Sequence, residues 1–349
     1  MREIRRRRRA ALLALLAVAA GTGACAPSPP SEDTEAVDIV IPDGATFQAV
    51  ADTLAAHGLI NRPRTFAVYA RLRGVDGKVK AGHYLIPPQA SWGQLLHILT
   101  TGRVATVPLT IPEGLRLTQI APRIAEVSGV SVDSVMKILA APGADSVYGV
   151  PGPGLEGYLF PDTYHFARGV SPRSMIRTMV DRYHQVWTPG RRARLDSLGM
   201  SEREIVTLAS IIQAEARRTA EMPLISSVYH NRLRRGWLLQ ADPTVLYALG
   251  GPRERLLYAA IDSVKDNPYN TYTQPGLPPG PIGSPGEKAI DAALHPAETN
   301  YMYFVARPGG HHVFTRTLAE HNRAKARARR EFDSLRATGA GGGLTDGQR

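Results

Sequence analysis

Apolar residues recur along the chain in short units that each predict a strand, a turn and an amphipathic helix. In residues 41–54 the turn sequence IPDG precedes apolar side chains at helical spacing, namely Phe47, Val50, Ala51 and Leu54. Residues 111–124 repeat this arrangement, with IPEG followed by Leu117, Ile120, Ala121 and Ile124. Residues 82–99 show the same order of elements between the two copies. The pattern predicts small units of mixed helix and strand, although turn chemistry alone also explains such short similarities.

A longer helix is predicted after residue 201, and it places a carboxylate on an apolar face. The residues three, four and seven positions before Glu215 are Ile212, Ile211 and Leu208, so they share its side of the helix. Burial disfavours a charged carboxylate and raises its pKa, which suits a proton donor near neutral pH. Glu215 is therefore the first candidate for catalysis. Periodicity alone leaves two other roles open, extension to solvent or pairing with Arg217, Arg218 or Arg232.

The same patterning predicts helices over residues 172–186, 224–234 and 318–336, and strands over 301–306 and 312–314. Residues 267–285 are rich in Pro, Gly, Asn and Tyr, a composition that excludes a regular helix or a central strand. The tyrosines favour an ordered loop with a binding role. Tyr, Asn and Asp side chains in such loops suit sugar recognition. Asp242, which precedes Pro243, fits this role or that of a cap for a helix over 244–249.

The N-terminus indicates export. The first nine residues contain six Arg, and an apolar run over residues 10–20 follows them, as in a secretory signal or a short membrane anchor. The basic side should stay cytoplasmic, which places the folded domains outside the bacterial inner membrane. Cys25, the only cysteine, follows small residues as in a lipoprotein, although Thr22 stands where an aliphatic residue is usual. Lipidation, an uncleaved anchor and ordinary cleavage stay open as alternatives.

Charge and histidine spacing argue against several other functions. The net charge is +11, and the N-terminal Arg cluster contributes a large part of it, so we expect no nucleic-acid partner. The histidines lack the His-Glu-x-x-His spacing, and the adjacent His311 and His312 would point to opposite faces of a strand. The sequence also contains no P-loop and no Gly-x-Gly-x-x-Gly motif, so we expect no metal and no cofactor. Composition also predicts a disordered linker over residues 26–36 and a disordered tail over 337–349.

Several ordered motifs resemble the YceG-like family of endolytic murein transglycosylases over residues 37–335. They are EGYLFPDTY (156–164), LASIIQAE (208–215), NRL (231–233), LQADPT (239–244), YNTYT (269–273), GLPPG (276–280), ALHP (293–296) and YFV (303–305). The resemblance implies an α+β protein: a signal peptide or anchor over residues 1–25, a LysM-like αβ subdomain over 37–105, and a mixed α/β catalytic domain over 106–336.

The resemblance also implies a reaction and a set of residues. Glu215 occupies the position of the family's catalytic glutamate, and Gln213 stands where some members have a second Glu. The implied reaction cleaves the β-1,4 bond between MurNAc and GlcNAc, forms a 1,6-anhydro-MurNAc end and terminates nascent glycan strands. Glu156, Tyr158, Asp242, Asn270 and Tyr272 are expected to contact the glycan, with Glu156 alternatively bracing the Glu215 helix.

The implied partners are peptidoglycan strands, peptidoglycan synthases and, through the N-terminus, the membrane. Two rival functions remain. One is a non-catalytic peptidoglycan-binding scaffold, and the other is a hydrolase that acts on the same substrate.

Overall fold

The computed structural model describes residues 36–42, 44–80, 82–101, 106–167, 170–251, 253 and 256–337. The predicted signal or anchor, the lipidation site Cys25, the linker up to residue 35 and the tail from residue 338 lie outside these residues. None of the helices in the described ranges combines the length and apolar character needed to cross a bilayer.

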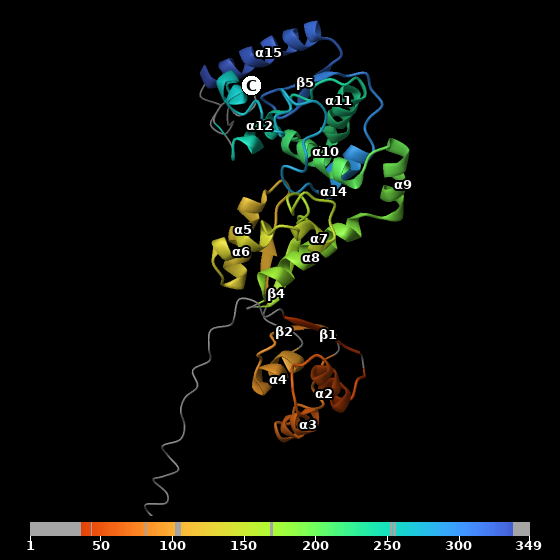
Figure 1. The fold of residues 1–349 in the computed structure, drawn as a ribbon, viewed down its shortest axis with the longest axis vertical. Coiled ribbons are helices and arrows are strands. Elements are labelled where there is room, and N and C mark those ends of the chain that lie inside the picture. The colour runs from red at the N-terminus through yellow and green to blue at the C-terminus, as the bar shows by residue number, and fades with distance from the viewer. Residues whose placement is uncertain are drawn as a thin grey trace, which may run out of the picture. The chain divides into compact units, whose positions relative to one another are not determined.

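The N-terminal body of the described chain has its own hydrophobic core. It contains β1 (Val37–Ile41), α2 (Phe47–Ala56), α3 (Pro63–Leu72), β2 (Gly82–Ile86) and α4 (Trp92–Thr101) (Figure 1). β1 and β2 pair antiparallel with Ile39 opposite Tyr84, and both side chains are buried. Phe66 of α3 fills the centre, with its ring edge-on to Trp92 at a centroid distance of 5.5 Å. Aromatic and aliphatic burial thus holds this small body together.

The rest of the described chain shares a second core. Its first part contains β3 (Thr106–Thr110), α5 (Leu117–Ser128), α6 (Val132–Leu139), α7 (Ala144–Tyr148), β4 (Thr163–Ala167), α8 (Pro172–Val186) and α9 (Pro189–Leu198). Its second part contains α10 (Glu202–Glu215), the 3-10 turn η1 (Thr219–Glu221), α11 (Met222–Arg234), α12 (Asp242–Ala248), α13 (Tyr258–Ser263), α14 (Glu287–Leu294), β5 (Tyr303–Ala306), β6 (His312–Thr315) and α15 (Leu318–Ala337).

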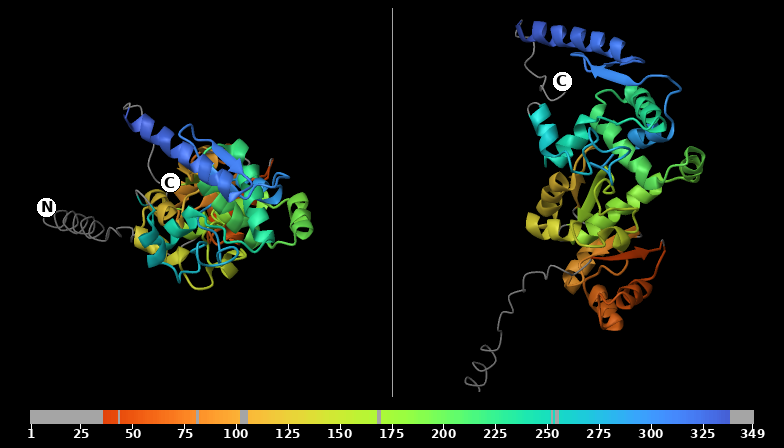
Figure 2. Two further views of the ribbon diagram at one scale, coloured as in Figure 1. Left: turned by 90° about the horizontal axis from the view of Figure 1, so that it is seen from above. Right: turned by 45° about the horizontal axis from the view of Figure 1, so that its top comes forward.

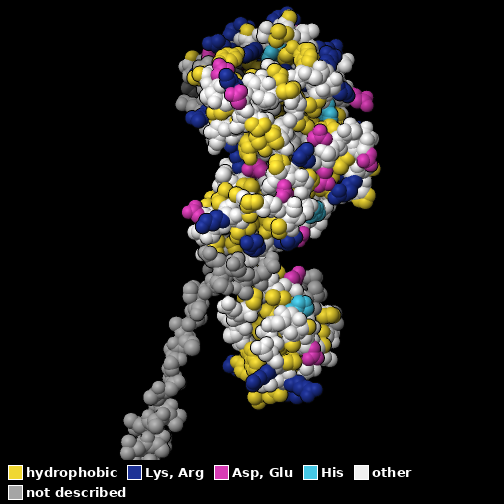
Figure 3. Space-filling model, viewed as in Figure 1, with side chains coloured by type: hydrophobic (Ala, Val, Ile, Leu, Met, Phe, Trp, Pro, Cys, Tyr) yellow, Lys and Arg dark blue, Asp and Glu magenta, His cyan; other side chains and the backbone are white. Residues whose placement is uncertain are grey.

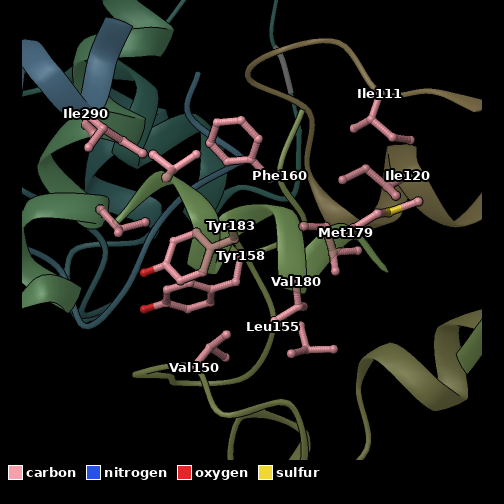
Figure 4. Close-up of a cluster of buried hydrophobic side chains, with 14 of the residues drawn as sticks. Ile111, Ile120, Val150, Leu155, Tyr158, Phe160, Met179, Val180, Tyr183 and Ile290 are labelled. Atoms are coloured by element: carbon pink, nitrogen blue, oxygen red, sulfur yellow. The ribbon is translucent and has the colours of Figure 1, made fainter. Parts of the chain in front are cut away.

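Two short antiparallel pairs organise this second body. β3 pairs with β4, with Thr110 opposite Thr163, and β5 pairs with β6. α15 packs against β5 and β6, and it lies across them in both views of Figure 2. Figure 4 shows part of the core, in which Tyr158, Tyr183 and Met179 lie among aliphatic side chains.

The helix α10 lies deep in this second core. Ser201 caps it: the Ser201 hydroxyl accepts a hydrogen bond from the Glu204 N–H at 3.3 Å, and the Glu204 carboxylate accepts from the Ser201 N–H at 2.8 Å. Every residue from Ile205 to Ile212 is buried, so the helix is enclosed on nearly all sides and not along one stripe. Its neighbours are α9, α11, α12 and α14.

The structure confirms several sequence predictions and corrects others. Both IPxG units form a strand, a turn and a helix, and the helix over 172–186 has the predicted bounds. Residues 267–285 form a loop without regular helix or strand. The sequence reading missed the short helices α3, α6, α7, α9, α13 and α14, and also β4, because short elements give weak periodicity. Division of the chain at residue 105 stays a prediction, although the two cores fall on either side of it.

Side-chain charge on the surface is mixed. On the face drawn in Figure 3, Lys and Arg side chains are scattered among acidic, apolar and neutral groups. In the described parts of the chain, no group of three or more His, Cys, Asp or Glu side chains is arranged to hold a metal ion.

Replacing the cap of α10 tests how much the local sequence stabilises the helix. We expect Ser201→Ala to lower the free energy of unfolding by about 1 kcal/mol, the usual effect of losing an N-cap. The Ser201 hydroxyl and N–H also donate to the Glu204 carboxylate, and these bonds lower the pKa of Glu204. The stabilisation from these two bonds is present above the ordinary carboxyl pKa and is lost on acidification through the lower folded value. Urea unfolding at several pH values measures both effects, with the exposed Ser263→Ala as control. Equal stability of the Ser201 variant and the parent at neutral pH would contradict the expectation.

Candidate active site

Glu215 is the last residue of α10, and its side chain is only 8% exposed. The Tyr229 hydroxyl of α11 donates a hydrogen bond to Glu215 Oε1 at 2.9 Å. Oε2 has no hydrogen-bond partner in the described chain, and it is not among the fully enclosed polar atoms, so the exposed part of the side chain includes this oxygen. The carboxyl group therefore has one oxygen held by the protein and one available to a ligand.

The surroundings of Glu215 favour its protonated form. Burial raises the pKa of Glu215 to about 8, and the negative charge of Asp242 adds to this effect. The Tyr229 hydrogen bond and the positive charge of Arg232 act in the opposite direction. Because desolvation is the largest of these influences, Glu215 carries a proton at neutral pH.

The two structural roles left open for Glu215 are wrong. Its small exposed fraction excludes extension of the carboxylate into solvent. Arg218 donates to Gly309 O at 2.7 Å, and Arg232 donates to Met302 O at 2.8 Å and to Leu239 O at 2.7 Å. Within the described residues, Glu215 forms no ion pair with these arginines or with Arg217.

Asp242 and Tyr272 both interact electrostatically with Glu215, and both are partly exposed. The Tyr272 hydroxyl donates to Asp242 Oδ1. Burial raises the pKa of Asp242, against the Tyr272 hydrogen bond and the charge of Lys325. The alternative role of Asp242 as a helix cap is wrong, because the cap position of α12 is Ala241 and no side chain caps it. We call Glu215, Tyr229, Asp242 and Tyr272 the acid cluster.

Asn270 does not reach the surface. Its side chain is fully buried, its amide donates to Ile261 O at 3.0 Å and Val264 O at 3.1 Å, and its Oδ1 accepts from the Tyr272 N–H at 3.0 Å. These bonds fix the loop that carries Tyr272. The expected glycan contact by Asn270 is therefore replaced by a supporting role.

Tyr158 is also a core residue and not a glycan-contacting one. Its side chain is fully buried, and its hydroxyl donates to Gly152 O at 2.8 Å. Its ring packs edge-on against Tyr183, with centroids 5.3 Å apart (Figure 4). The EGY part of the motif thus contributes packing at this position.

Glu156 is partly exposed, and both of its oxygens are hydrogen-bonded. Oε1 accepts from the Leu117 N–H at 3.1 Å, and Oε2 accepts from the Tyr247 hydroxyl at 3.4 Å. Burial raises the pKa of Glu156 to about 7, opposed by the Leu117 N–H and the charge of Arg116. These bonds connect Glu156 to α5 and α12, and neither of them reaches the α10 helix directly.

Sequence reasoning missed Tyr229 and the contact made by Gln213. Tyr229 falls on the buried face of α11, and a buried phenol needs a hydrogen-bond partner, which was the available signal. Gln213 Oε1 accepts from the Gly286 N–H at 3.1 Å, at the start of α14. No sequence pattern pointed to that contact, because it joins residues 73 positions apart.

Comparisons with known proteins show which family the chain belongs to. The sequence model of the YceG-like family matches residues 39–327. The chain is 35% identical over 306 residues to an endolytic murein transglycosylase of Bacillus subtilis, covering 83% of this chain and 84% of that protein. It is 31% identical over 299 residues to an endolytic murein transglycosylase of Streptococcus pneumoniae, covering 77% of this chain. This chain spans about half, 54%, of the streptococcal protein.

A solved structure shares the fold. The crystal structure of a YceG-like protein from Listeria monocytogenes matches with a TM-score of 0.57 at 34% identity, covering 83% of this chain and 99% of that one. The mixture of helices and strands expected from the sequence is thereby confirmed. The family model covers most of the chain, and the motifs around Glu215 lie within it, so this chain belongs to the YceG-like family.

Proposed function

We propose that this protein is an endolytic peptidoglycan lytic transglycosylase in which Glu215 is both the general acid and the general base. The observation that carries the proposal is a buried carboxyl that is protonated at neutral pH, with one oxygen bound by Tyr229 and the other available. Membership of a family whose Bacillus subtilis and Streptococcus pneumoniae relatives are endolytic murein transglycosylases supports the choice of substrate.

In the first step, protonated Glu215 gives its proton to the glycosidic oxygen between MurNAc and GlcNAc, and the bond from MurNAc C1 to that oxygen breaks. A raised pKa suits this step, because an acid catalyst must hold its proton at the working pH. Asp242 contributes by keeping Glu215 protonated, and Tyr272 holds Asp242 in place.

In the second step, ionised Glu215 accepts the proton of the MurNAc 6-hydroxyl as that oxygen bonds to C1. The product is a 1,6-anhydro-MurNAc end, and Glu215 is protonated again. Ordinary glycosidases need a second carboxylate to activate water or to attack the sugar. Here the substrate supplies the nucleophile, so a single acid is sufficient.

The remaining parts of the proposal concern the cellular setting. Residues 37–105 form a LysM-like glycan-binding subdomain, and the N-terminus anchors the protein to the inner membrane with its folded domains outside the cytoplasm. There the enzyme terminates nascent strands beside peptidoglycan synthases. The compact N-terminal core and the export pattern of residues 1–25 support this setting.

Removing the carboxyl tests the assignment of the catalytic residue. We expect Glu215→Gln to keep its affinity for glycan and to lose turnover by about 100-fold or more, the usual contribution of acid–base catalysis. Mass spectrometry of the fragments released from purified sacculi measures the effect. Continued release of anhydro-muropeptides by the variant would refute the role of Glu215. Reducing ends from the parent protein would indicate a hydrolase, and binding without any release would indicate a scaffold.

The pH profile separates the influences on Glu215. Activity requires protonated Glu215, so kcat/KM should fall as pH rises through its pKa of about 8. Asp242→Asn removes a charge that raises this pKa, so the fall should move to lower pH. Tyr229→Phe removes a hydrogen bond that lowers it, so the fall should move to higher pH. Shifts of both variants in the same direction would contradict this electrostatic picture.

The pH dependence of the free energy of unfolding tests the burial of Glu215 without substrate. The folded pKa of Glu215 is raised, so the folded protein holds a proton that the unfolded chain releases above its ordinary pKa. The parent should therefore lose stability relative to Glu215→Gln as pH rises from the ordinary carboxyl pKa to about 8, and the difference should be constant above that. Urea unfolding of both proteins across this range measures it. A difference that does not change with pH would show that the carboxyl is not desolvated.

A further inference from the structure

A second polar group of side chains shares α12 and the 267–285 loop with the acid cluster. It consists of Arg116, Glu156, Tyr247 and Tyr269, all partly exposed, and we call it the arginine cluster. The rings of Tyr247 and Tyr269 lie 4.7 Å apart, and the Arg116 guanidinium lies 4.9 Å from the centroid of the Tyr247 ring. The cation is thus held against an aromatic face, an arrangement that stabilises it and fixes its position.

The backbone that carries Arg116 is also fixed. Its N–H donates to Gln119 Oε1 at 3.0 Å in the first turn of α5. The next N–H, that of Leu117, donates to Glu156 Oε1 at 3.1 Å, and Glu156 is bonded in turn to Tyr247. The cluster is therefore preorganised, because the same side chains that surround the guanidinium also hold the helix start that bears it.

The guanidinium lies over the Tyr247 ring, but its N–H donors are unused within the described chain. It makes no hydrogen bond or ion pair within the described chain, whereas Arg191 bonds Asp291, Glu287 and Val186 O, and Arg232 bonds the carbonyls of Met302 and Leu239. A half-buried guanidinium has five donors that need acceptors. Partly exposed aromatic rings beside unused donors are suited to a ligand from outside.

Glu156 is the carboxyl group whose charge acts on Arg116, but its two oxygens are already occupied by the Leu117 N–H and the Tyr247 hydroxyl. Burial also raises the pKa of Glu156 to about 7, so it is partly neutral at physiological pH. It therefore leaves the charge of Arg116 incompletely balanced, which favours an anionic group as the ligand.

One helix and one loop join the two clusters. At the start of α12, Asp242 is bonded to Tyr272, and five residues further on Tyr247 packs against Tyr269 of the same loop. Five helical residues advance about 7.5 Å along the helix axis and turn about 140° around it. A glycan strand that extends from Glu215 around α12 would therefore bring neighbouring units towards Arg116.

We propose that Arg116 binds a carboxylate of the peptidoglycan strand while the bond to be cleaved lies at Glu215. The planar guanidinium matches a carboxylate through two parallel hydrogen bonds. The carboxylate comes either from the lactyl group of a MurNAc without peptide or from a stem peptide. This inference rests on the proposed function, since it assigns a further subsite for the same substrate.

Binding to the inactive Glu215→Gln protein tests the subsite without turnover. The ligands are soluble glycan strands with stem peptides, the same strands after an amidase has removed the peptides, and a chitooligosaccharide without carboxylates. We expect an added Arg116→Ala change to weaken binding of a carboxylated strand by about 10-fold or more, as for loss of a charged hydrogen-bond pair. Binding of the chitooligosaccharide should not change. Arg116→Lys should restore part of the affinity, since it keeps the charge and loses the planar fork.

Arg123→Ala is the matched control, because it removes an exposed charge from the same helix. An effect restricted to peptide-bearing strands identifies a stem-peptide carboxylate, and one restricted to stripped strands identifies the lactyl carboxylate. Equal weakening of chitooligosaccharide binding, or no weakening of any ligand, would overturn the inference. If Glu215→Gln with Arg116 intact bound none of the glycans, the proposed function itself would fail, which separates the two results.

Discussion

The carboxyl group of Glu215 is withdrawn from water at the end of a helix that is itself enclosed, and only one hydrogen bond compensates. A buried carboxylate without strong partners is costly, and the protein lowers this cost by keeping the group protonated. Asp242 reinforces that state, and Tyr229 orients the carboxyl without neutralising the effect of burial. The reactivity proposed for the site thus arises from what surrounds Glu215 and from how little of it is hydrated.

Keeping α10 enclosed depends on contacts far apart in the sequence. Ser210 accepts a hydrogen bond from the Ile282 N–H at 3.0 Å, and Gln213 accepts one from the Gly286 N–H, so the Pro- and Gly-rich loop is attached directly to the helix. The same loop approaches the IPEG turn so closely that a Cβ on Gly283 would lie 2.8 Å from Gly114 O. Gly157 combines a φ of +86° with a close approach to Pro281, where a side chain could not fit. Parts of the family motifs therefore serve to bring loops against α10.

The sequence allowed prediction of those features that depend on local pattern. The helix start at Ser201, the apolar positions before Glu215 and the loop character of residues 267–285 all follow from neighbouring residues. The sequence did not allow prediction of which motif residues are exposed. Tyr158 and Asn270 have the same chemistry as sugar-contacting residues, but both lie in the core. Strand β4 was missed because it is defined by pairing with β3, 53 residues away at Thr110 and Thr163. Long-range pairing decides these features, and a local pattern does not record it.

Two glutamates of the described chain have pKa values raised by burial, and burial alone does not distinguish them. Glu156, with a pKa of about 7, and Glu215, with a pKa of about 8, are both desolvated. They differ in the use of their oxygens: those of Glu156 are taken by a backbone N–H and a phenol, whereas Glu215 has a second oxygen without a partner in the described chain. A proton donor needs an oxygen that can face the substrate, so this difference supports the catalytic role proposed for Glu215 and not one for Glu156. The occupied carboxyl of Glu156 instead fixes the helix start that presents Arg116.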